Sequence, residues 1–165
     1  MRITDRAALD GILRAAPILY LALNADPAPY VIPVCFGVDG DRLYVHGAAA
    51  GMKIDLIRAN PFVGFSACTD VAIRAGADAC SFTASGMSVA GTGRARIVED
   101  GKERIRGLDA IVRHYHSEAG APPVYRPQSL ARTCVIAIHI ATLQGKRMGG
   151  APESPPGPIR KQDPT

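Results

Sequence analysis

The sequence predicts a mainly β protein, a small antiparallel β-barrel with flanking helices, and three observations support this fold class. The chain has 165 residues, 47% of them hydrophobic and 21% charged, which suits one domain with a buried core. Short apolar stretches with period-two alternation recur along it, separated by turns rich in glycine and proline. These stretches mostly follow one another directly, which favours antiparallel pairing over a parallel sheet with alternating helices.

The first part of the chain is expected to form a helix, three strands and a second helix. Thr4 is a candidate N-cap for the first helix, and Pro17 ends it. Asp39-Gly40 predicts a hairpin turn between the second and third strands, and Asn60-Pro61 stops the second helix. We expect helices over residues 4–16 and about 52–60, with strands over 18–23, 30–38 and 41–46.

The second part is expected to add three strands and one longer helix. Asp100 begins this helix, and apolar residues at helical spacing, Tyr115 among them, line its buried side. Residues 71–79 are ambiguous and can be read as a loop, and residues 118–129 are expected to form a loop. We expect strands over 62–69, 88–99 and 133–145 and a helix over 100–117, which gives about six strands in all. Residues 1–150 then form the domain, and the proline-rich residues 151–165 form a mobile tail.

Charge and cysteine content argue against several functional classes. The net charge is +4, but the basic residues are scattered and the densest cluster, residues 102–106, lies beside acidic ones. We therefore expect that the protein does not bind nucleic acid. A steep salt dependence of DNA or RNA binding would favour a nucleic-acid-binding protein instead. The four cysteines show no metal-type spacing, and the longest early apolar run is too short to span a bilayer. We expect a cytoplasmic protein without a metal or a membrane partner.

Three motifs lack the context that their chemistry needs. Gly91-Thr92-Gly93 is followed by strand residues, so the dinucleotide fingerprint fails, and Gly64-Phe65-Ser66 has no strand-to-helix turn for a nucleophilic serine. His114 and His116 are two apart on a helix and point to nearly opposite sides, so they do not share a metal ion. His139 alternates with isoleucines in the last strand and is expected to face the surface or the barrel pore.

The run LYVHGAAAGMKIDLI, residues 43–57, joins a strand to a helix through residues with almost no side chain. A helix N-terminus exposes unpaired backbone N–H groups and a partial positive charge, and small residues let an anion approach them. Lys53 adds a formal charge in the first turn. Two interpretations remain open, a phosphate cradle or a tight turn against the sheet with an exposed lysine.

The ordered run PYVIPVCFGVDGDRLYVHGAAAGMKIDLIRANPFVGFSA, residues 29–67, resembles the pyridoxamine 5′-phosphate oxidase-like FMN-binding split-barrel family, in its nitroimidazole-resistance branch. The shared features are a Pro-x-x-x-Pro strand, an Asp-Gly hairpin, a Gly-x-Lys turn and a short helix that ends in Asn-Pro. Ser88-Val89, Gly93-Arg94-Ala95 and Gly145-Lys146-Arg147 also match the family pattern. One departure is Met87, where this branch usually has an aromatic residue, with Phe82 further back.

The resemblance covers about residues 5–150 and implies a six-stranded antiparallel split β-barrel, FMN as cofactor, and a homodimer with the cofactor site at the subunit interface. Residues 47–53 would hold the phosphate, residues 32–36 would lie along the flavin ring, and Lys146 and Arg147 would reach the site across the interface. His46 is the candidate catalytic residue, and the alternative is a strand-end histidine bonded to a backbone carbonyl. The predicted cofactor-binding residues are Ile32, Pro33, Val34, Cys35, Phe36, His46, Gly47, Ala48, Ala49, Gly51, Met52, Lys53, Ser88, Lys146 and Arg147.

Two functional classes follow from this resemblance. The leading one is an FMN-dependent oxidoreductase of a small molecule, which reduces a nitro group or takes hydride from an amine-bearing carbon. The alternative is a non-enzymatic flavin or haem binding or storage protein, with His46 or His139 as the axial ligand of a haem. A nucleic-acid-binding barrel is the third and least supported class.

Overall fold

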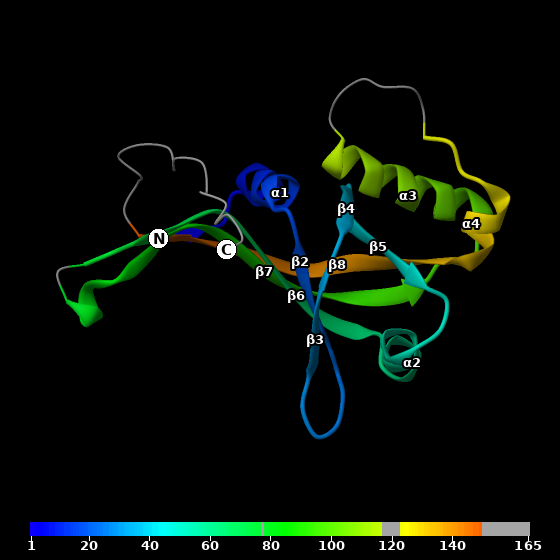
Figure 1. Ribbon diagram of the computed structural model, residues 1–165, viewed down its shortest axis with the longest axis horizontal. Helices are drawn as coiled ribbons and strands as arrows, with labels where there is room; N and C mark the ends of the chain where they lie inside the picture. The colour runs from blue at the N-terminus through cyan, green and yellow to red at the C-terminus, as the bar shows by residue number, and fades with distance from the viewer. Residues whose placement is uncertain (77, 117–122, 150–165) are drawn as a thin grey trace, which may run out of the picture.

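The computed structural model describes residues 1–76, 78–116 and 123–149, and its centre is a strongly curved antiparallel sheet (Figure 1). The strands lie in the order β3-β2-β6-β7-β8-β5-β4, and β1 pairs with β8. The described residues form eight strands where about six were expected, and the antiparallel fold class is confirmed. The strands are β1 (Arg2–Ile3), β2 (Leu19–Leu23), β3 (Tyr30–Val34), β4 (Phe36–Asp39), β5 (Arg42–Ala48), β6 (Phe62–Arg74), β7 (Thr83–Ile97) and β8 (Thr133–Met148).

The barrel closes at Cys35, which separates β3 from β4. These two strands stand at opposite ends of the sheet order, yet one residue joins them, and a residue spans only about 3.6 Å of chain. The sheet must therefore curl until its two ends lie side by side. The prediction of a single strand over residues 30–38 was wrong. The chain stops pairing with β2 at Cys35, and the next strand, β4, pairs with β5 instead.

The barrel interior holds the main apolar core, and two helices pack onto it. α1 (Arg6–Ala15) contributes Leu9, Ile12 and Leu13, and α2 (Met52–Ala59) contributes Ile54 and Ile57. The N-cap of α1 is Asp5, whose Oδ2 accepts a hydrogen bond of 2.8 Å from the backbone N–H of Ala8. The expected cap, Thr4, was wrong by one residue, because the carboxylate of Asp5 already satisfies this N–H.

Two further helices cover the outside of β4, β5 and the first part of β8 (Figure 1). α3 (Gly101–Tyr115) has the predicted cap, Asp100, which accepts from the N–H of Glu103 at 2.7 Å. Its apolar residues pack with Tyr44, Val135 and Ala137 in a second, smaller core. α4 (Pro127–Arg132) was missed, since the sequence favoured a loop over residues 118–129; it is six residues long, too short to show helical periodicity.

The hairpin of β6 and β7 extends beyond the barrel as an arm, at the left of Figure 1. Residues 71–74, interpreted as part of a loop, belong to β6, and β7 begins at Thr83. The register shifts between Thr69 and Ala72, and Asp70 has φ of 54°, so a bulge interrupts the alternation that the sequence should otherwise show. A short 3-10 turn (Ala79–Ser81) lies between the two strands of the arm.

Parts of the chain lie outside the described residues. They include residues 117–122, where the expected end of the long helix and the start of the following loop fall, and the expected tail, residues 151–165. None of the helices in the described part of the chain combines the length and the apolar character needed to cross a membrane.

Candidate functional site

The turn between β5 and α2 is built from glycines and alanines, as the sequence indicated. Gly51 is the N-cap of α2 with φ of 116°, a conformation that favours glycine, and no side chain caps the helix. A Cβ atom on Gly47 would lie 2.7 Å from Nζ of Lys53, so the lysine amine rests against the backbone of Gly47. The turn, the open helix N-terminus and one ammonium group thus face the same space.

Two arginines join Lys53 around the start of β8. Gly47 pairs with Cys134, a buried residue whose thiol pKa is raised by burial, while Lys53, Arg104 and Arg58 act on this pKa in the opposite direction. Nε of Arg104 is buried and has no hydrogen-bond partner among the described residues. Within the same part of the chain, no carboxylate lies within 4.0 Å of the Lys53 amine. We call Gly47, Lys53, Arg58 and Arg104 the cationic turn.

The seam between β3 and β4 lies beside this turn. Phe36 pairs with Val45 in an antiparallel register, so Cys35, the residue before Phe36, lies toward His46, the residue after Val45. Val34 and Phe36 are buried in the core, which leaves the backbone of residues 32–36 for contact with a ligand. Because β3 ends the sheet order, alternate N–H and C=O groups along it have no strand partner. One protomer therefore brings together the two predicted segments, residues 32–36 and 46–53.

Tyr115 holds the seam in place, a role that the sequence did not reveal. Its hydroxyl accepts a hydrogen bond from the backbone N–H of Phe36 at 3.1 Å and donates to the carbonyl of Pro17 at 2.9 Å. Burial, with a contribution from the neighbouring Cys35, raises the pKa of Tyr115. The ring was expected on the buried side of its helix, but it is 41% exposed, because its contact is a polar one at the end of the barrel.

The four histidines differ in exposure and in their hydrogen-bond and ion-pair partners. His46 is exposed at the end of β5, and its ring has no hydrogen-bond partner among the described residues. His139 lies on the surface and is paired with Asp41, with 2.9 Å between Nε2 and Oδ2. His114 lies 2.8 Å from the carbonyl oxygen of Ala16, and His116 ends α3. No cluster of three potential metal ligands occurs in the described ranges.

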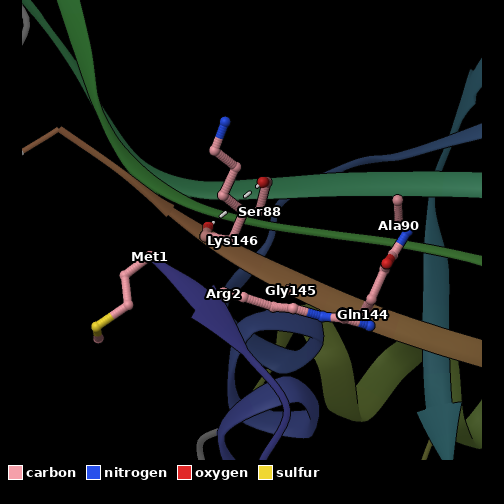
Figure 2. Close-up of a pocket in the computed structure, with 7 residues that line it drawn as sticks. All are labelled: Met1, Arg2, Ser88, Ala90, Gln144, Gly145 and Lys146. Carbon is pink, nitrogen blue, oxygen red and sulfur yellow. Dashed lines mark hydrogen bonds between the residues drawn. The ribbon is translucent and has the colours of Figure 1, made fainter.

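The remaining predicted residues, Ser88, Lys146 and Arg147, lie at the other end of the barrel. Ser88 pairs with Lys146, and its hydroxyl donates to the Lys146 carbonyl at 3.4 Å. Figure 2 shows this pair, with the lysine side chain extending away from the sheet, beside a hollow of about 460 Å³. From position 134 to 146 the strand covers about 40 Å at ~3.3 Å per residue. Within one protomer, this end of the barrel therefore lies far along β8 from the cationic turn.

Of the two residues that could stand in place of the family's aromatic residue, Met87 and Phe82, only Met87 lies beside Ser88. Met87 is half-buried and pairs with Arg147, while Phe82 lies on the arm and is exposed. Of the two, Met87 therefore lies next to the predicted residues Ser88, Lys146 and Arg147.

The chemistry of the cationic turn fits a phosphate ester. Backbone N–H groups at a helix N-terminus favour a bound anion. So do an ammonium group and a buried guanidinium N–H that have no carboxylate partner and no acceptor, respectively, among the described residues. The adjoining backbone edge of β3 can bond the polar rim of a flat ring. Arg58, Arg104 and Tyr115 were missed as site residues. Arg104 and Tyr115 come from a helix far along the chain, and no local pattern links them to the turn.

Comparison with known proteins gives one family match and several structural relatives. A family model described as pyridoxamine 5′-phosphate oxidase matches residues 5–147. An uncharacterised protein of Rhizobium meliloti (strain 1021) is 35% identical over 63 residues, which are 38% of this chain and 41% of that protein. The chain thus matches less than half the length of this curated relative.

Solved structures share the fold over most of the chain. A candidate 5-nitroimidazole antibiotic resistance protein of Bacteroides thetaiotaomicron has a TM-score of 0.77 at 24% identity, covering 90% of this chain and 87% of its own. The flavocytochrome Anf3 of Azotobacter vinelandii has a TM-score of 0.76 at 23% identity, covering 99% and 82%. An FAD and haem binding protein of Mycobacterium smegmatis has a TM-score of 0.76 at 23% identity, covering 93% and 76%.

Proposed function

Because the chain belongs to the pyridoxamine 5′-phosphate oxidase family, we propose that it is a flavoprotein that binds FMN and acts as an oxidoreductase on a small molecule. The observation that carries this proposal is the cationic turn, where Lys53 rests against Gly47 at an open helix N-terminus. The unpartnered Nε of Arg104 supports it, since a buried guanidinium N–H without an acceptor is costly.

The two ends of an FMN molecule have separate partners in this proposal. Residues 47–53 and the neighbouring arginines hold the phosphate, and the free backbone edge at residues 32–36 bonds the polar rim of the ring. Tyr115 is a positioning residue here, because its hydroxyl fixes the seam at Phe36. When bound, FMN supplies hydride or electron transfer, and the chain binds it, orients it and limits its access to water.

A second copy of the chain completes the site in this proposal. Ser88, Lys146 and Arg147 lie about 40 Å along β8 from the cationic turn, too far to contact the same cofactor within one protomer. A homodimer with the site at its interface would place these side chains of one subunit beside the turn of the other. The free thiols Cys35, Cys68, Cys80 and Cys134 support a reducing, cytoplasmic location.

His46 is the residue that we assign to proton transfer in this site. It adjoins both the cationic turn and the seam, it is exposed, and its ring has no hydrogen-bond partner among the described residues. An imidazole can donate or accept a proton at a substrate close to the ring. The nitro-reducing and amine-oxidising variants of the proposal both need such a group.

The bound molecule itself provides the test. The protein, purified without added cofactor, is heated, and the released compound is identified by absorption spectrum and chromatography against FMN, FAD and haem. We expect FMN, since the cationic turn offers one phosphate site. Release of FAD would correct the cofactor. Haem bands, as expected for relatives of a flavocytochrome, would favour the haem-binding alternative with His46 as ligand, because His139 is already paired with Asp41. A colourless protein that binds none of the three would overturn the proposal.

Substrate choice is tested on the FMN-loaded protein. One assay supplies a reductant and a nitroaromatic compound, and the other supplies pyridoxamine 5′-phosphate and oxygen. Turnover in only one assay assigns the substrate class. Flavin binding without turnover in either would support a binding or storage protein instead of an enzyme.

A further inference from the structure

A small hollow lies where the C-terminal parts of α1 and α3 meet β4 (Figure 1). Its volume is about 270 Å³, and it is lined by Arg14, Val38, Ala110, Arg113 and His114. None of these residues belongs to the cationic turn. Val38 pairs with Leu43 in β5, four residues before Gly47, so the hollow lies about 13 Å along the strand from that turn at ~3.3 Å per residue. We call it the α1–α3 hollow.

Two positively charged side chains line the α1–α3 hollow without a counter-ion. Arg14 comes from the last turn of α1, and Arg113 comes from the last turn of α3. Both are exposed, and among the described residues neither has a carboxylate within 4.0 Å. A cation near a helix C-terminus interacts favourably with the helix dipole, which accounts for one arginine on each helix. The dipole does not account for the meeting of both at one hollow.

The carboxylates on the two helices are bonded to other groups. Asp10, four residues before Arg14 on α1, accepts a hydrogen bond of 2.9 Å from Nε of Arg6. Asp109, four residues before the arginine of α3, accepts one of 2.6 Å from the hydroxyl of Tyr125. Each aspartate is placed at the helical spacing that favours an ion pair, and each is already engaged. The helices therefore do not neutralise the two arginines of the hollow.

The carboxylate of β4 near the hollow is engaged as well. Arg106 bonds Asp39, and this hydrogen bond is the main reason that the pKa of Asp39 is lowered. Arg113 and Arg14 lower the same pKa through their charge, so both lie close to this end of β4. Three arginines thus surround one carboxylate. An excess of positive charge remains at the hollow.

A backbone N–H group of β4 adds a third donor beside the two arginines. β4 is the last strand in the sheet order, so its second edge is not paired with a strand. The two-residue turn after Asp39 makes Asp39 and Arg42 a hydrogen-bonded pair, so the pair before it, which contains Val38, is a non-hydrogen-bonded one. The N–H of Val38 therefore faces the free edge, as does that of Phe36, which donates to Tyr115.

We propose that the α1–α3 hollow binds the oxyanion of a small molecule, with Arg14 and Arg113 as charged donors and the N–H of Val38 as a neutral one. Guanidinium groups suit carboxylates and phosphates because they can give two parallel hydrogen bonds. Val38 and Ala110 supply an apolar wall, which favours a carboxylate attached to a short apolar group. The volume lies just below the range of about 300–1,000 Å³ for small-molecule sites, so the ligand must be compact. This inference does not depend on the proposed function.

The first test is calorimetric titration of the protein as purified, with any bound flavin retained, in a chloride buffer. The probes are benzoate, acetate and inorganic phosphate. Arg14→Gln and Arg113→Gln should each weaken benzoate binding by about tenfold or more, as expected for the loss of a charged hydrogen bond. Lys102→Gln is the matched control, because it removes the same charge at the exposed start of α3, and it should bind as the parent does.

The order of affinities distinguishes the sources of the oxyanion. Benzoate should bind more tightly than acetate, since only benzoate can cover the apolar wall. Phosphate that binds more tightly than benzoate, and is lost in both arginine variants, would uphold the site and assign it to phosphate esters.

Nuclear magnetic resonance locates the bound anion without relying on any arginine variant. His114 lines the α1–α3 hollow, whereas His46 adjoins the cationic turn, so their ring protons report on the two places separately. Each ring is assigned by its histidine-to-glutamine variant. Benzoate should shift the signals of His114 and leave those of His46 unchanged.

Several outcomes would overturn the inference. They are the absence of saturable binding of all three anions, equal weakening in Lys102→Gln, and a benzoate shift at His46 instead of His114. Anion binding that is lost in Lys53→Ala but kept in Arg113→Gln would also overturn it, and would support the cationic turn instead. Benzoate binding at His114 in a protein that binds no flavin would uphold the hollow while the proposed function fails.

Discussion

Lys53 occupies a position where a cation is unfavourable unless an anion is near. It is the second residue of α2, where the helix dipole is positive, and none of the described carboxylates lies within 4.0 Å of its amine. Arg58 and Arg104 add positive charge from two other positions. A phosphate group bound in the proposed site would relieve this repulsion, and the Lys53 amine already rests against Gly47 there.

Lys53→Ala should weaken FMN binding by roughly tenfold or more, because a hydrogen bond to a charged group contributes about 1.5–3 kcal/mol. Fluorescence titration of the apoprotein with FMN measures this change. Lys102→Ala, on the exposed start of α3, is the control and should bind as the parent does. Equal affinity in Lys53→Ala and Lys102→Ala would rule out the cationic turn as the phosphate site.

His46→Ala should slow turnover of the FMN-loaded protein while FMN affinity stays within about threefold of the parent. The ring is exposed and unpartnered in the described structure, so its loss leaves no buried group unsatisfied. His46→Asn should keep binding and lose the step that needs a proton near neutral pH. The measurement is the pH dependence of turnover in parent and variants. Unchanged profiles would show that the proton comes from another source.

At this scale the sequence predicted the residues that share a local motif and missed those that arrive from elsewhere. Lys53 and Gly47 are six residues apart in a recognisable turn. Burial raises the pKa of Cys134, which pairs with Gly47, and Arg104 of α3 acts to lower this pKa. Tyr115 reaches the seam from the end of that helix. The positions of Arg104 and Tyr115 in the sequence do not predict this arrangement, because it depends on how α3 lies across β4 and β5.

Between elements, β4 and α3 approach each other closely at Gly37. Gly37 lies so near the helix that a Cβ atom would be 2.5 Å from the carbonyl oxygen of Ala110 and against the backbone of Ile111. Helix backbone cannot yield as a flexible side chain can. The absence of a side chain at Gly37 therefore sets the distance of α3 from the barrel, and with it the position of Tyr115 and Arg104.

Gly37→Ala should lower the free energy of unfolding by about 2 kcal/mol or more, in the upper range for overpacking. Gly11→Ala is the matched control, since it adds the same methyl group within α1 where nothing lies within 4 Å. It should raise stability by about 0.5–1 kcal/mol, the helix preference of alanine over glycine. Urea denaturation at equal protein concentration compares the two. Similar stability of both variants would contradict the close β4–α3 contact.

Glu103 ties α3 to the sheet through charged contacts. It accepts from Nη2 of Arg96 at 2.5 and 2.6 Å, and it also accepts from the hydroxyl of Tyr44 and lies near Arg42. The hydrogen bond from Arg96 is the main reason that the pKa of Glu103 is lowered. A carboxylate with a lowered pKa contributes stability above its unfolded pKa of about 4.3, and this contribution is lost as pH falls through the folded pKa.

Glu103→Gln should therefore cost about 1 kcal/mol of unfolding free energy at pH 7, a modest value because Arg96 is half exposed and solvent screens the pair. The difference from the parent should shrink as pH falls below about 4.3. Urea denaturation over pH 3 to 7 measures it, with the exposed Glu99→Gln as control. A difference that stays constant down to acid pH would mean that packing, and not charge, accounts for it.

Elements with a clean period were predictable, and those defined by a single exceptional residue were not. β2, β5 and β8 alternate or run apolar over many residues and were expected near their observed bounds. The break at Cys35 and the bulge after Thr69 each depend on one position, and neither residue type marks it. The antiparallel fold class can be predicted from the order and alternation of the apolar stretches. Barrel closure cannot, because it depends on β3 and β4 standing at opposite ends of the strand order.

For the whole molecule, the proposed homodimer with a shared site brings like charges together. One end of the barrel carries the cationic turn, and the other carries Arg2, Lys146 and Arg147. Side chains that approach within a Debye length of about 8 Å repel one another at physiological salt. An anion between the two ends would turn this repulsion into attraction. Dimer formation and phosphate binding should therefore be thermodynamically linked, each strengthening the other.

We expect FMN to lower the dimer dissociation constant by about tenfold or more, a coupling of ~1.4 kcal/mol. Riboflavin is the control ligand, because it carries the same ring without the phosphate, and it should tighten the dimer much less. Lys53→Ala should reduce the effect of FMN, and high salt should reduce it further since it screens both the repulsion and the attraction. Sedimentation or light scattering of dilution series with FMN, riboflavin or no ligand measures all three. Equal tightening by riboflavin and FMN would assign the coupling to the ring contacts and leave the charges at the two ends without a part in assembly.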